Sequence, residues 1–384
     1  EIVKGAASSL YGSNAVGGVV NIISKVPAEP WTVNLNGRYG AYNEQRYGGT
    51  IGFNVGKFNS VTNVQHTQVD EKDLADGKTN EETEDWAYDR DTPIEEVLSD
   101  PSFGEYARLL FPIEEGYYSG DTLGTLSLVW YNNIDPNKTV EIVNSLKERA
   151  NAGQTIFYDI YTEEEKTQDP DKRNTGLFFF KGTPGAKFAV CNAGGGFAYV
   201  GAMQDSFPHA LELSKLGYNA FALIYRPSAQ AACEDLARAI SFIFEHAEEL
   251  EVDASDYSLW GGSAGGRMAA WVASYGTAAF GGDDLPRPAA VIMQYTGYSE
   301  YSEFDPPTFA CVGENDGIAS WQQMKRRLEV LDSMGIDTEF HSYPGLQHGF
   351  GLGTGTVAEG WLNDAVSFWE RQMNKTETVE NAER

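Results

Sequence analysis

The sequence is poor in cysteine, in basic residues and in long apolar runs. It contains only three cysteines, Cys191, Cys233 and Cys311, which are too few and too far apart for a disulfide scaffold or a zinc site. Lysine and arginine number 28 against 56 acidic residues, giving a net charge of −28. Because so negative a chain repels phosphate backbones, we expect no nucleic acid partner. No apolar run approaches the roughly 18 residues that a membrane-spanning helix needs, so no such helix is predicted.

The chain does contain many apolar and aromatic side chains. Hydrophobic residues make up 41% and aromatic residues 12% of its 384 residues, which is enough for a large core and speaks against a mostly disordered chain. This length is typical of two to three domains. The sequence begins at Glu1 and shows no signal peptide, so we expect a fragment or a processed product.

Composition divides the chain into four parts. Residues 1–70 are rich in glycine and asparagine, and alternation of apolar and polar residues over 31–39 and 47–58 predicts β-hairpins. Acidic residues dominate 71–100, which predicts a solvated linker. A globular domain is predicted over 101–374, with 101–154 as its N-terminal extension, followed by a frayed tail at 375–384.

From residue 155 onward, strand-like segments alternate with helix-like segments. Strands are predicted at 155–161, 177–181, 188–191, 218–225, 257–260, 289–294, 308–312 and 338–343. Helices are predicted at 207–216, 231–250, after residue 263, at 321–334 and from 361, and a charged solvated loop at 163–173. This alternation favours an α/β fold, a mostly parallel sheet covered by helices on both faces.

A possible nucleophile lies between a predicted strand and a predicted helix. Gly261-Gly262-Ser263-Ala264-Gly265 is a G-x-S-x-G pattern, in which a sharp turn lifts the serine hydroxyl above the sheet and leaves no room for large neighbours. The alternative is a tight turn with no chemistry. Because the pattern lies between a predicted strand and a predicted helix, we favour a catalytic role for Ser263.

The serine needs a base and an acid at the same edge of the sheet. Of the five histidines, His348 follows the last predicted strand in a loop, and Asp316 directly follows the predicted strand 308–312. Glu314 and Asp305 are the rival acids. The order Ser263, Asp316, His348 along the chain is that of the α/β-hydrolases, and we predict that these three residues are catalytic.

An oxyanion hole is predicted from backbone amides. Gly194, Gly195 and Gly196 follow a predicted strand, and glycines let N–H groups approach a ligand closely. Gly195, Gly196 and the amide of Ala264 are the predicted donors. A phosphate-binding loop is the alternative, but no Gly-Lys-Ser/Thr follows. No metal or cofactor is required.

These segments resemble the α/β-hydrolase fold esterases over about 101–374. The triple glycine is similar to the HGGG motif of the hormone-sensitive-lipase-like group, but Ala193 replaces its histidine and Gly262 replaces the aspartate usual in its elbow. Residues 192–197 (NAGGGF), 261–265 (GGSAG), 313–317 (GENDG) and 348–350 (HGF) look closer to bacterial acetyl- and feruloyl-type carbohydrate esterases. The resemblance implies a serine carboxylic ester hydrolase that acts on short-chain acyl esters of carbohydrates.

A different resemblance covers the N-terminal segment. Residues 1–25 look like the end of a TonB-dependent receptor plug domain, and the alternating segment after them looks like the first strands of its barrel. Two to four strands cannot close a barrel that needs about 22, so we interpret residues 1–70 as a fusion or an assembly junction.

Two other functions remain open from the sequence. An oligopeptidase-type serine peptidase would use the same triad, and a non-catalytic protein associated with an outer-membrane receptor would not use it. The expected partner is a small-molecule or oligosaccharide ester; association with further copies of the chain is left open. Residues 71–150, including Tyr117, Tyr118 and Trp130, are candidates for a cover over the site. A cytoplasmic location is slightly favoured for the hydrolase part, and the outer membrane only if residues 1–70 belong to a complete receptor.

Overall fold

The computed structural model describes residues 2–3, 19–20, 31–39, 45–55, 58–68, 87–111 and 116–382. The chain divides into two units, Glu1–Ala87 and Tyr88–Arg384. None of the helices in the described ranges is long and apolar enough to cross a lipid bilayer.

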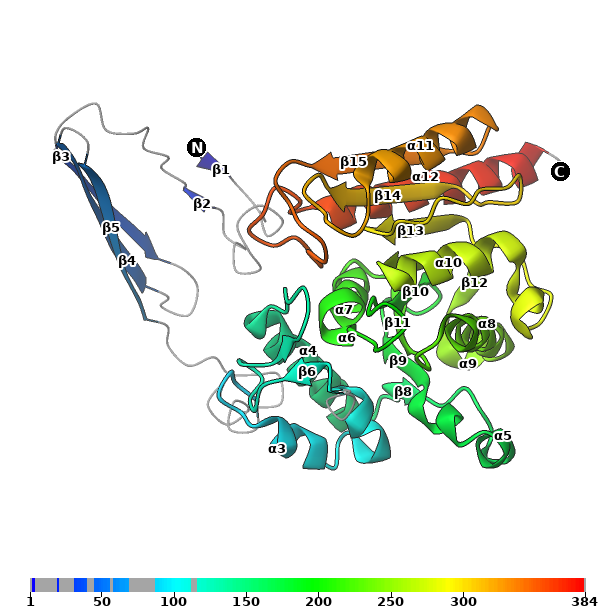
Figure 1. The fold of residues 1–384 in the computed structure, drawn as a ribbon. Coiled ribbons are helices and arrows are strands. Elements are labelled where there is room, and N and C mark those ends of the chain that lie inside the picture. Colours follow the sequence, from blue (N-terminus) through cyan, green and yellow to red (C-terminus); the bar gives the residue numbers. More distant parts are fainter. Residues whose placement is uncertain are drawn as a thin grey trace. The chain divides into compact units, whose positions relative to one another are not determined.

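The first unit contains short antiparallel strands. β1 (Ile2–Val3) pairs with β2 (Val19–Val20). β3 (Trp31–Tyr39), β4 (Gln45–Val55) and β5 (Phe58–Gln68) form a three-stranded antiparallel meander (Figure 1). The hairpins predicted from the alternation over 31–58 are therefore confirmed. Most of the plug-like segment 1–25 lies outside the described residues, and its resemblance stays a prediction.

The second unit is built on an eight-stranded sheet in the order β15-β14-β13-β12-β10-β11-β9-β8. Its strands are β8 (Phe157–Tyr158), β9 (Gly176–Phe180), β10 (Lys187–Asn192), β11 (Asn219–Ile224), β12 (Asp253–Gly262), β13 (Ala290–Gln294), β14 (Thr308–Gly313) and β15 (Thr338–Tyr343). The pairs from β15 to β11 are parallel, whereas β9 and β8 join antiparallel at one edge. The predicted mostly parallel sheet is thus confirmed.

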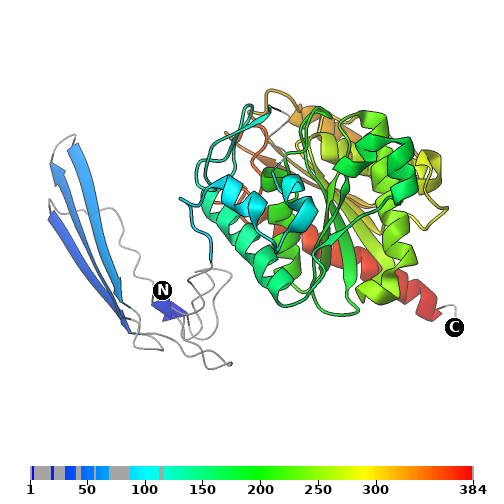
Figure 2. The same ribbon diagram turned by 90° about the horizontal axis from the view of Figure 1, so that it is seen from below.

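Helices cover both faces of this sheet (Figures 1 and 2). They are α6 (Ala202–Asp205), α7 (Phe207–Lys215), α8 (Ala229–Glu245), α9 (Ala247–Leu250), α10 (Ala264–Tyr275), α11 (Trp321–Ser333) and α12 (Trp361–Ala382). α7 packs on β10 and β11, while α10 packs on β12 and β13. Because both faces are covered, every residue of β9, β11, β13 and β14 is buried.

Two expectations for the chain ends of this unit are wrong. α12 continues to Ala382, where a tail from 375 was predicted; the stretch contains no glycine or proline to stop the helix. The predicted linker 71–100 also extends too far. Tyr88 is buried, and α3 (Ile94–Ser99) buries Ile94 and Val97, so the folded unit begins before residue 100.

The N-terminal extension adds structure that no periodicity predicted. It consists of a 3₁₀ helix (Gly104–Leu109), β6 (Tyr118–Ser119) paired with β7 (Ser127–Leu128), and α4 (Pro136–Asn151). Asp135 is the N-cap of α4, and its carboxylate accepts hydrogen bonds from the N–H groups of Asn137 and Lys138. The helix buries Ile142, Val143 and Leu146 in the core of the unit.

The predicted charged loop at 163–173 is also wrong. α5 (Glu163–Gln168) and a 3₁₀ helix (Pro170–Asn174) occupy it. Thr162 and Glu165 form a capping box at the start of α5. Lys166 is buried and pairs with Asp159 and Glu163, so the high charge of the segment does not keep it unfolded.

Candidate active site

The nucleophile candidate lies at a strained turn between β12 and α10. Ser263 has φ 51° and ψ −117°, a conformation that costs energy in a non-glycine residue. A Cβ at Gly261 would overlap Gly265, and a Cβ at Gly265 would overlap the carbonyl oxygen of Asn192. Residues without side chains are therefore needed on both sides of the serine, which explains the G-x-S-x-G pattern.

The structure brings the three predicted triad residues together at the carboxyl edge of the sheet. His348 Nε2 lies 3.0 Å from Ser263 Oγ, and His348 Nδ1 lies 2.8 Å from Asp316 Oδ2. The His348 side chain is 7% exposed and the Asp316 side chain is inaccessible. This geometry allows a proton to pass from the serine to an imidazole whose other nitrogen is held by a carboxylate.

Neither rival acid contacts His348. The Glu314 carboxylate accepts a hydrogen bond from the hydroxyl of Ser342 at 2.8 Å. Asp305 forms a buried ion pair with Arg327 at 2.8 Å. Glu314 and Asp316 both follow β14, but only the Asp316 carboxylate reaches the imidazole of His348.

The glycine loop after β10 lies beside the nucleophile. A Cβ at Gly194 would lie 3.0 Å from the Cβ of Ser263. Gly195 and Gly196 have φ of 133° and 62°, conformations that favour glycine. Among the described residues, the N–H groups of Gly195, Gly196 and Ala264 have no hydrogen-bond acceptor. These amides are therefore available to an oxyanion formed at the serine.

A cavity of about 290 Å³ opens above Ser263. Its polar side includes Ser263, His348 and the glycine loop, and its apolar side includes Leu128, Trp130, Tyr131, Tyr199 and Ile318. Residues 128–131 belong to the N-terminal extension, so part of the extension lines the site, as expected of a cover. Trp130 and Ile318 are each 56% exposed and leave apolar surface near the serine.

Tyr117 and Tyr118, the other two aromatic residues singled out in the extension, pack behind the apolar side of this cavity. The Tyr117 ring stacks on Tyr199 at 4.7 Å between centroids and meets Trp130 at 5.6 Å. The buried hydroxyl of Tyr118 donates to the carbonyl of Val200 at 2.6 Å. Sequence patterns gave no means of locating Tyr199 and Val200 as partners, because these two contacts join segments about 80 residues apart.

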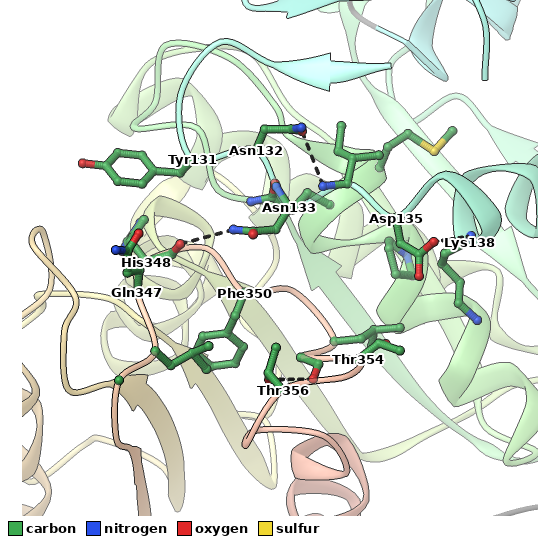
Figure 3. A pocket seen from close by; sticks show the side chains of 18 residues that line it. Tyr131, Asn132, Asn133, Asp135, Lys138, Gln347, His348, Phe350, Thr354 and Thr356 are labelled. Atoms are coloured by element: carbon green, nitrogen blue, oxygen red, sulfur yellow. Dashed lines mark hydrogen bonds between the residues drawn. The ribbon is translucent and has the colours of Figure 1, made fainter. Parts of the chain in front are cut away.

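A second cavity of about 680 Å³ borders the same histidine (Figure 3). Residues 131–138 supply one wall and residues 345–356 the other. Asn133 and Asp135 face Thr354 and Thr356 across it (Figure 3). The Asn133 amide donates to the carbonyl of Gly349 at 2.8 Å and so joins the two walls. Tyr131, Gln204 and His348 line both cavities.

A further ionisable group, Asp205, lies under the site and was not predicted. Its carboxylate is 6% exposed and borders the smaller cavity, and burial raises its pKa. The available sequence signal was indirect: the small residues Gly194 and Gly262 leave space that its side chain fills.

No group of three or more histidine, cysteine, aspartate or glutamate side chains suited to a metal ion is found among residues that the structure describes. Cys191, Cys233 and Cys311 are all free and buried. Burial raises the pKa of each thiol, so these cysteines are poor nucleophiles and metal ligands.

Comparison with known proteins gives one family match. The model of the family BD-FAE matches residues 181–285, a stretch that holds the glycine loop and Ser263 but neither Asp316 nor His348. It does not extend to residues 1–70, so it lends no support to the receptor resemblance there. No curated protein matches the chain.

Solved structures that resemble the chain include three hydrolases. An acetyl ester-xyloside bifunctional hydrolase from Caldicellulosiruptor lactoaceticus is 21% identical, with 56% of this chain and 95% of that chain covered at a TM-score of 0.49. A sugar hydrolase from Lactococcus lactis is 21% identical, with 52% and 95% covered at 0.45. A truncated carbohydrate esterase from gut microbiota is 17% identical, with 52% and 90% covered at 0.43.

The family match and the observed architecture agree. The mostly parallel eight-stranded sheet, with a strained serine turn leading from β12 into α10, has the architecture of the α/β-hydrolases. BD-FAE is a family of α/β-hydrolase esterases, and its model matches the stretch that contains this turn. The second unit therefore has the fold of the α/β-hydrolases, and the match supports a carboxylic ester hydrolase.

Proposed function

We propose that the chain is a serine carboxylic ester hydrolase with Ser263 as nucleophile, His348 as base and Asp316 as the acid that orients the imidazole. The observation that carries the proposal is the continuous line of hydrogen bonds from Ser263 through His348 to Asp316, at 3.0 and 2.8 Å. At the serine end of this line lie the backbone N–H groups of Gly195, Gly196 and Ala264, which have no acceptor within the described residues.

The reaction proceeds in two halves. His348 Nε2 takes the Ser263 proton while Oγ attacks the ester carbonyl, and the resulting oxyanion accepts hydrogen bonds from Gly195, Gly196 and Ala264. The imidazolium then gives its proton to the leaving alcohol, and an acyl-serine remains. Water attacks this acyl group, His348 takes the water proton and returns it to Ser263 Oγ, and the carboxylic acid leaves.

The two cavities support an ester of a short acyl group with a carbohydrate. The smaller cavity, of about 290 Å³, has the apolar side chains of Leu128, Trp130 and Ile318 for an acyl chain. Because His348 protonates the leaving alcohol, the alcohol half must lie next to the imidazole, which also borders the larger cavity. Asn133, Asp135 and the two threonines of that cavity are hydrogen-bonding groups suited to hydroxyl-rich alcohols.

Replacing the nucleophile tests the chemistry. Ser263→Ala abolishes hydrolysis of p-nitrophenyl acetate and labelling by a fluorophosphonate probe, because no hydroxyl remains to attack. Ser333→Ala is the matched control: this exposed serine ends α11 and its hydroxyl donates to the carbonyl of Val330 at 2.6 Å. Unchanged turnover in Ser263→Ala, with normal folding, contradicts the proposal.

A substrate panel tests the alcohol and acyl groups. We expect hydrolysis of acetylated xylan or feruloylated arabinose at higher kcat/KM than of the corresponding simple alkyl esters. Cleavage of aminoacyl anilides without cleavage of any of these esters would favour the peptidase. Failure of the probe to label the wild-type serine would favour a non-catalytic protein.

A further inference from the structure

A buried carboxylate outside the triad connects two of the loops that form the site. Asp205 ends α6, and its side chain lies beneath the glycine loop at 6% exposure. Its Oδ2 accepts the N–H of Gly194 at 3.0 Å. Its Oδ1 accepts the hydroxyl proton of Tyr295 at 2.6 Å. Gly194 and Tyr295 thus hold one carboxylate oxygen each, at the carboxyl edge of the sheet.

Tyr295 extends this connection to the histidine loop. Its hydroxyl oxygen accepts the N–H of Gly351 at 3.2 Å, three residues after His348. Its ring lies edge to face with the His348 imidazole, 5.1 Å between centroids. Tyr295 also has φ 32°, a conformation that is rare for an aromatic residue and is characteristic of functional sites.

The carboxylate fills space that two glycines leave open. A Cβ at Gly194 would lie 2.6 Å from Asp205 Oδ2, and a Cβ at Gly262 would lie 2.9 Å from the same atom. Gly262 directly precedes Ser263. The carboxylate therefore packs between the glycine loop and the serine turn, where any side chain at either position would displace it.

Holding this group in the interior is costly. Burial disfavours the charged form of the carboxylate, and no cation pairs with Asp205 among the described residues. The cost is offset by the hydrogen bonds from Gly194 and Tyr295. A polar group kept at such a cost beside an active site is a candidate for a functional role.

We propose that Asp205 and Tyr295 are positioning residues that set the glycine loop and the histidine loop at a fixed separation around Ser263. The hydrogen-bond chain from Gly194 N–H through Asp205 and Tyr295 to Gly351 N–H aligns the oxyanion donors with the imidazole. This inference rests on the proposed ester hydrolase function. Each side chain acts by holding a loop that contacts the substrate.

Two single variants and their combination test the proposal. Tyr295→Phe removes only the hydroxyl, and Asp205→Asn replaces one acceptor oxygen by an amide with nearly the same shape. Each lowers kcat for p-nitrophenyl acetate about 10²-fold, the size expected of a misplacement near 1 Å, with KM changed less than about two-fold. Because both variants break the same chain, the double variant loses little more than the worse single variant.

A matched control separates positioning from general loss of a buried hydrogen bond. Tyr257 is also a buried tyrosine, and its hydroxyl donates to the carbonyl of Pro286 at 2.9 Å, but it lies outside both cavities. Tyr257→Phe keeps the wild-type kcat. The melting temperature of every variant is measured, and if Asp205→Asn does not fold, Tyr295→Phe decides the test.

The outcomes separate this inference from the proposed function. A wild-type chain that cleaves the ester while Ser263→Ala does not, with wild-type kcat in folded Tyr295→Phe and Asp205→Asn, overturns the positioning role alone. A rise in KM without a fall in kcat overturns it as well. A folded wild-type chain with no esterase activity overturns the proposed function and this inference together.

Discussion

One oxygen of the Asp316 carboxylate lies 2.8 Å from His348 Nδ1, while its other oxygen accepts the main-chain N–H groups of Ile318 and Ala319, each at 2.7 Å. The backbone of the following turn therefore holds the carboxylate in one orientation toward the imidazole. In that orientation the carboxylate accepts a hydrogen bond from the Nδ1–H group, and Nε2 is left as the base that faces Ser263.

Replacing this acid should cost most of the activity. Asp316→Asn can present an amide N–H to the ring and favour the wrong tautomer, so we expect kcat to fall by about 10³–10⁴. Glu314→Gln is the control, because Glu314 contacts Ser342 and not His348; it keeps the wild-type kcat. Steady-state hydrolysis of an aryl acetate measures both. Equal losses in the two variants would mean that the acid has been assigned wrongly.

Gly195→Ala tests the oxyanion loop. The new Cβ would overlap the carbonyl oxygen of Tyr199, so the loop must shift and its N–H groups move away from the oxyanion. We expect kcat to fall at least about 10²-fold, the usual effect of losing one such donor.

Gly185→Ala is the control for this variant. Gly185 also has positive φ, 77°, but a Cβ there meets no atom within 4 Å. Both variants carry a backbone cost because φ is positive at each position, but only Gly195→Ala adds a clash at the site. A Gly195→Ala enzyme with wild-type kcat would exclude this loop from the oxyanion hole.

The central part of the site could be located from the sequence because parallel strands place their carboxyl ends at one edge. Ser263, Asp316 and His348 each follow a predicted strand, and the register of β12, β14 and β15 brings them to that edge. The pattern around each residue is local, and the sheet supplies the long-range contact. The strand and helix order was predictable for the same reason, since burial on both faces gives continuous apolar runs.

The surroundings of the triad could not be located in this way. Trp130 and Tyr131 lie in irregular backbone after a two-residue strand, so no periodicity marks them. Asp205 is one of 56 acidic residues, and what distinguishes it is burial against Gly194 and Gly262, which are 11 and 57 positions away. Such contacts depend on tertiary packing and leave no local pattern.

Trp130→Ala should change acyl specificity. The exposed indole lines the smaller cavity and lies 5.6 Å from the Tyr117 ring, so an aromatic acyl group can pack against it. Loss of one aromatic contact costs about 0.5–1.5 kcal/mol, which predicts up to a roughly ten-fold rise in KM for feruloyl esters and little change for acetyl esters.

Tyr275→Ala is the matched control for this specificity. Tyr275 is 59% exposed and ends α10, where its ring contacts Phe280, and it lines neither cavity. KM values of both esters are compared for the two variants. Equal KM changes for acetyl and feruloyl esters in Trp130→Ala would contradict an acyl site at the indole.

Stability should fall as the pH drops below neutrality, and His209 should account for part of the change. The ring is 2% exposed, neither nitrogen has a hydrogen-bond partner within the described residues, and burial lowers its pKa to about 4. The unfolded chain binds this proton near pH 6.5 and the folded chain does not until about pH 4. Between these values the unfolded state binds more protons, so the free energy of unfolding decreases with falling pH.

The contribution of His209 can be isolated with one variant. By the linkage relation, proton uptake at His209 lowers the free energy of unfolding by about 2 kcal/mol between pH 7 and pH 5. His209→Leu fills a similar volume without nitrogens, so it should lose that part of the pH dependence and keep at least the wild-type stability at pH 7. Urea unfolding at the two pH values measures the difference between the wild type and His209→Leu. If His209→Leu retains the full pH dependence of the free energy of unfolding, protonation of the His209 imidazole does not destabilise the folded state.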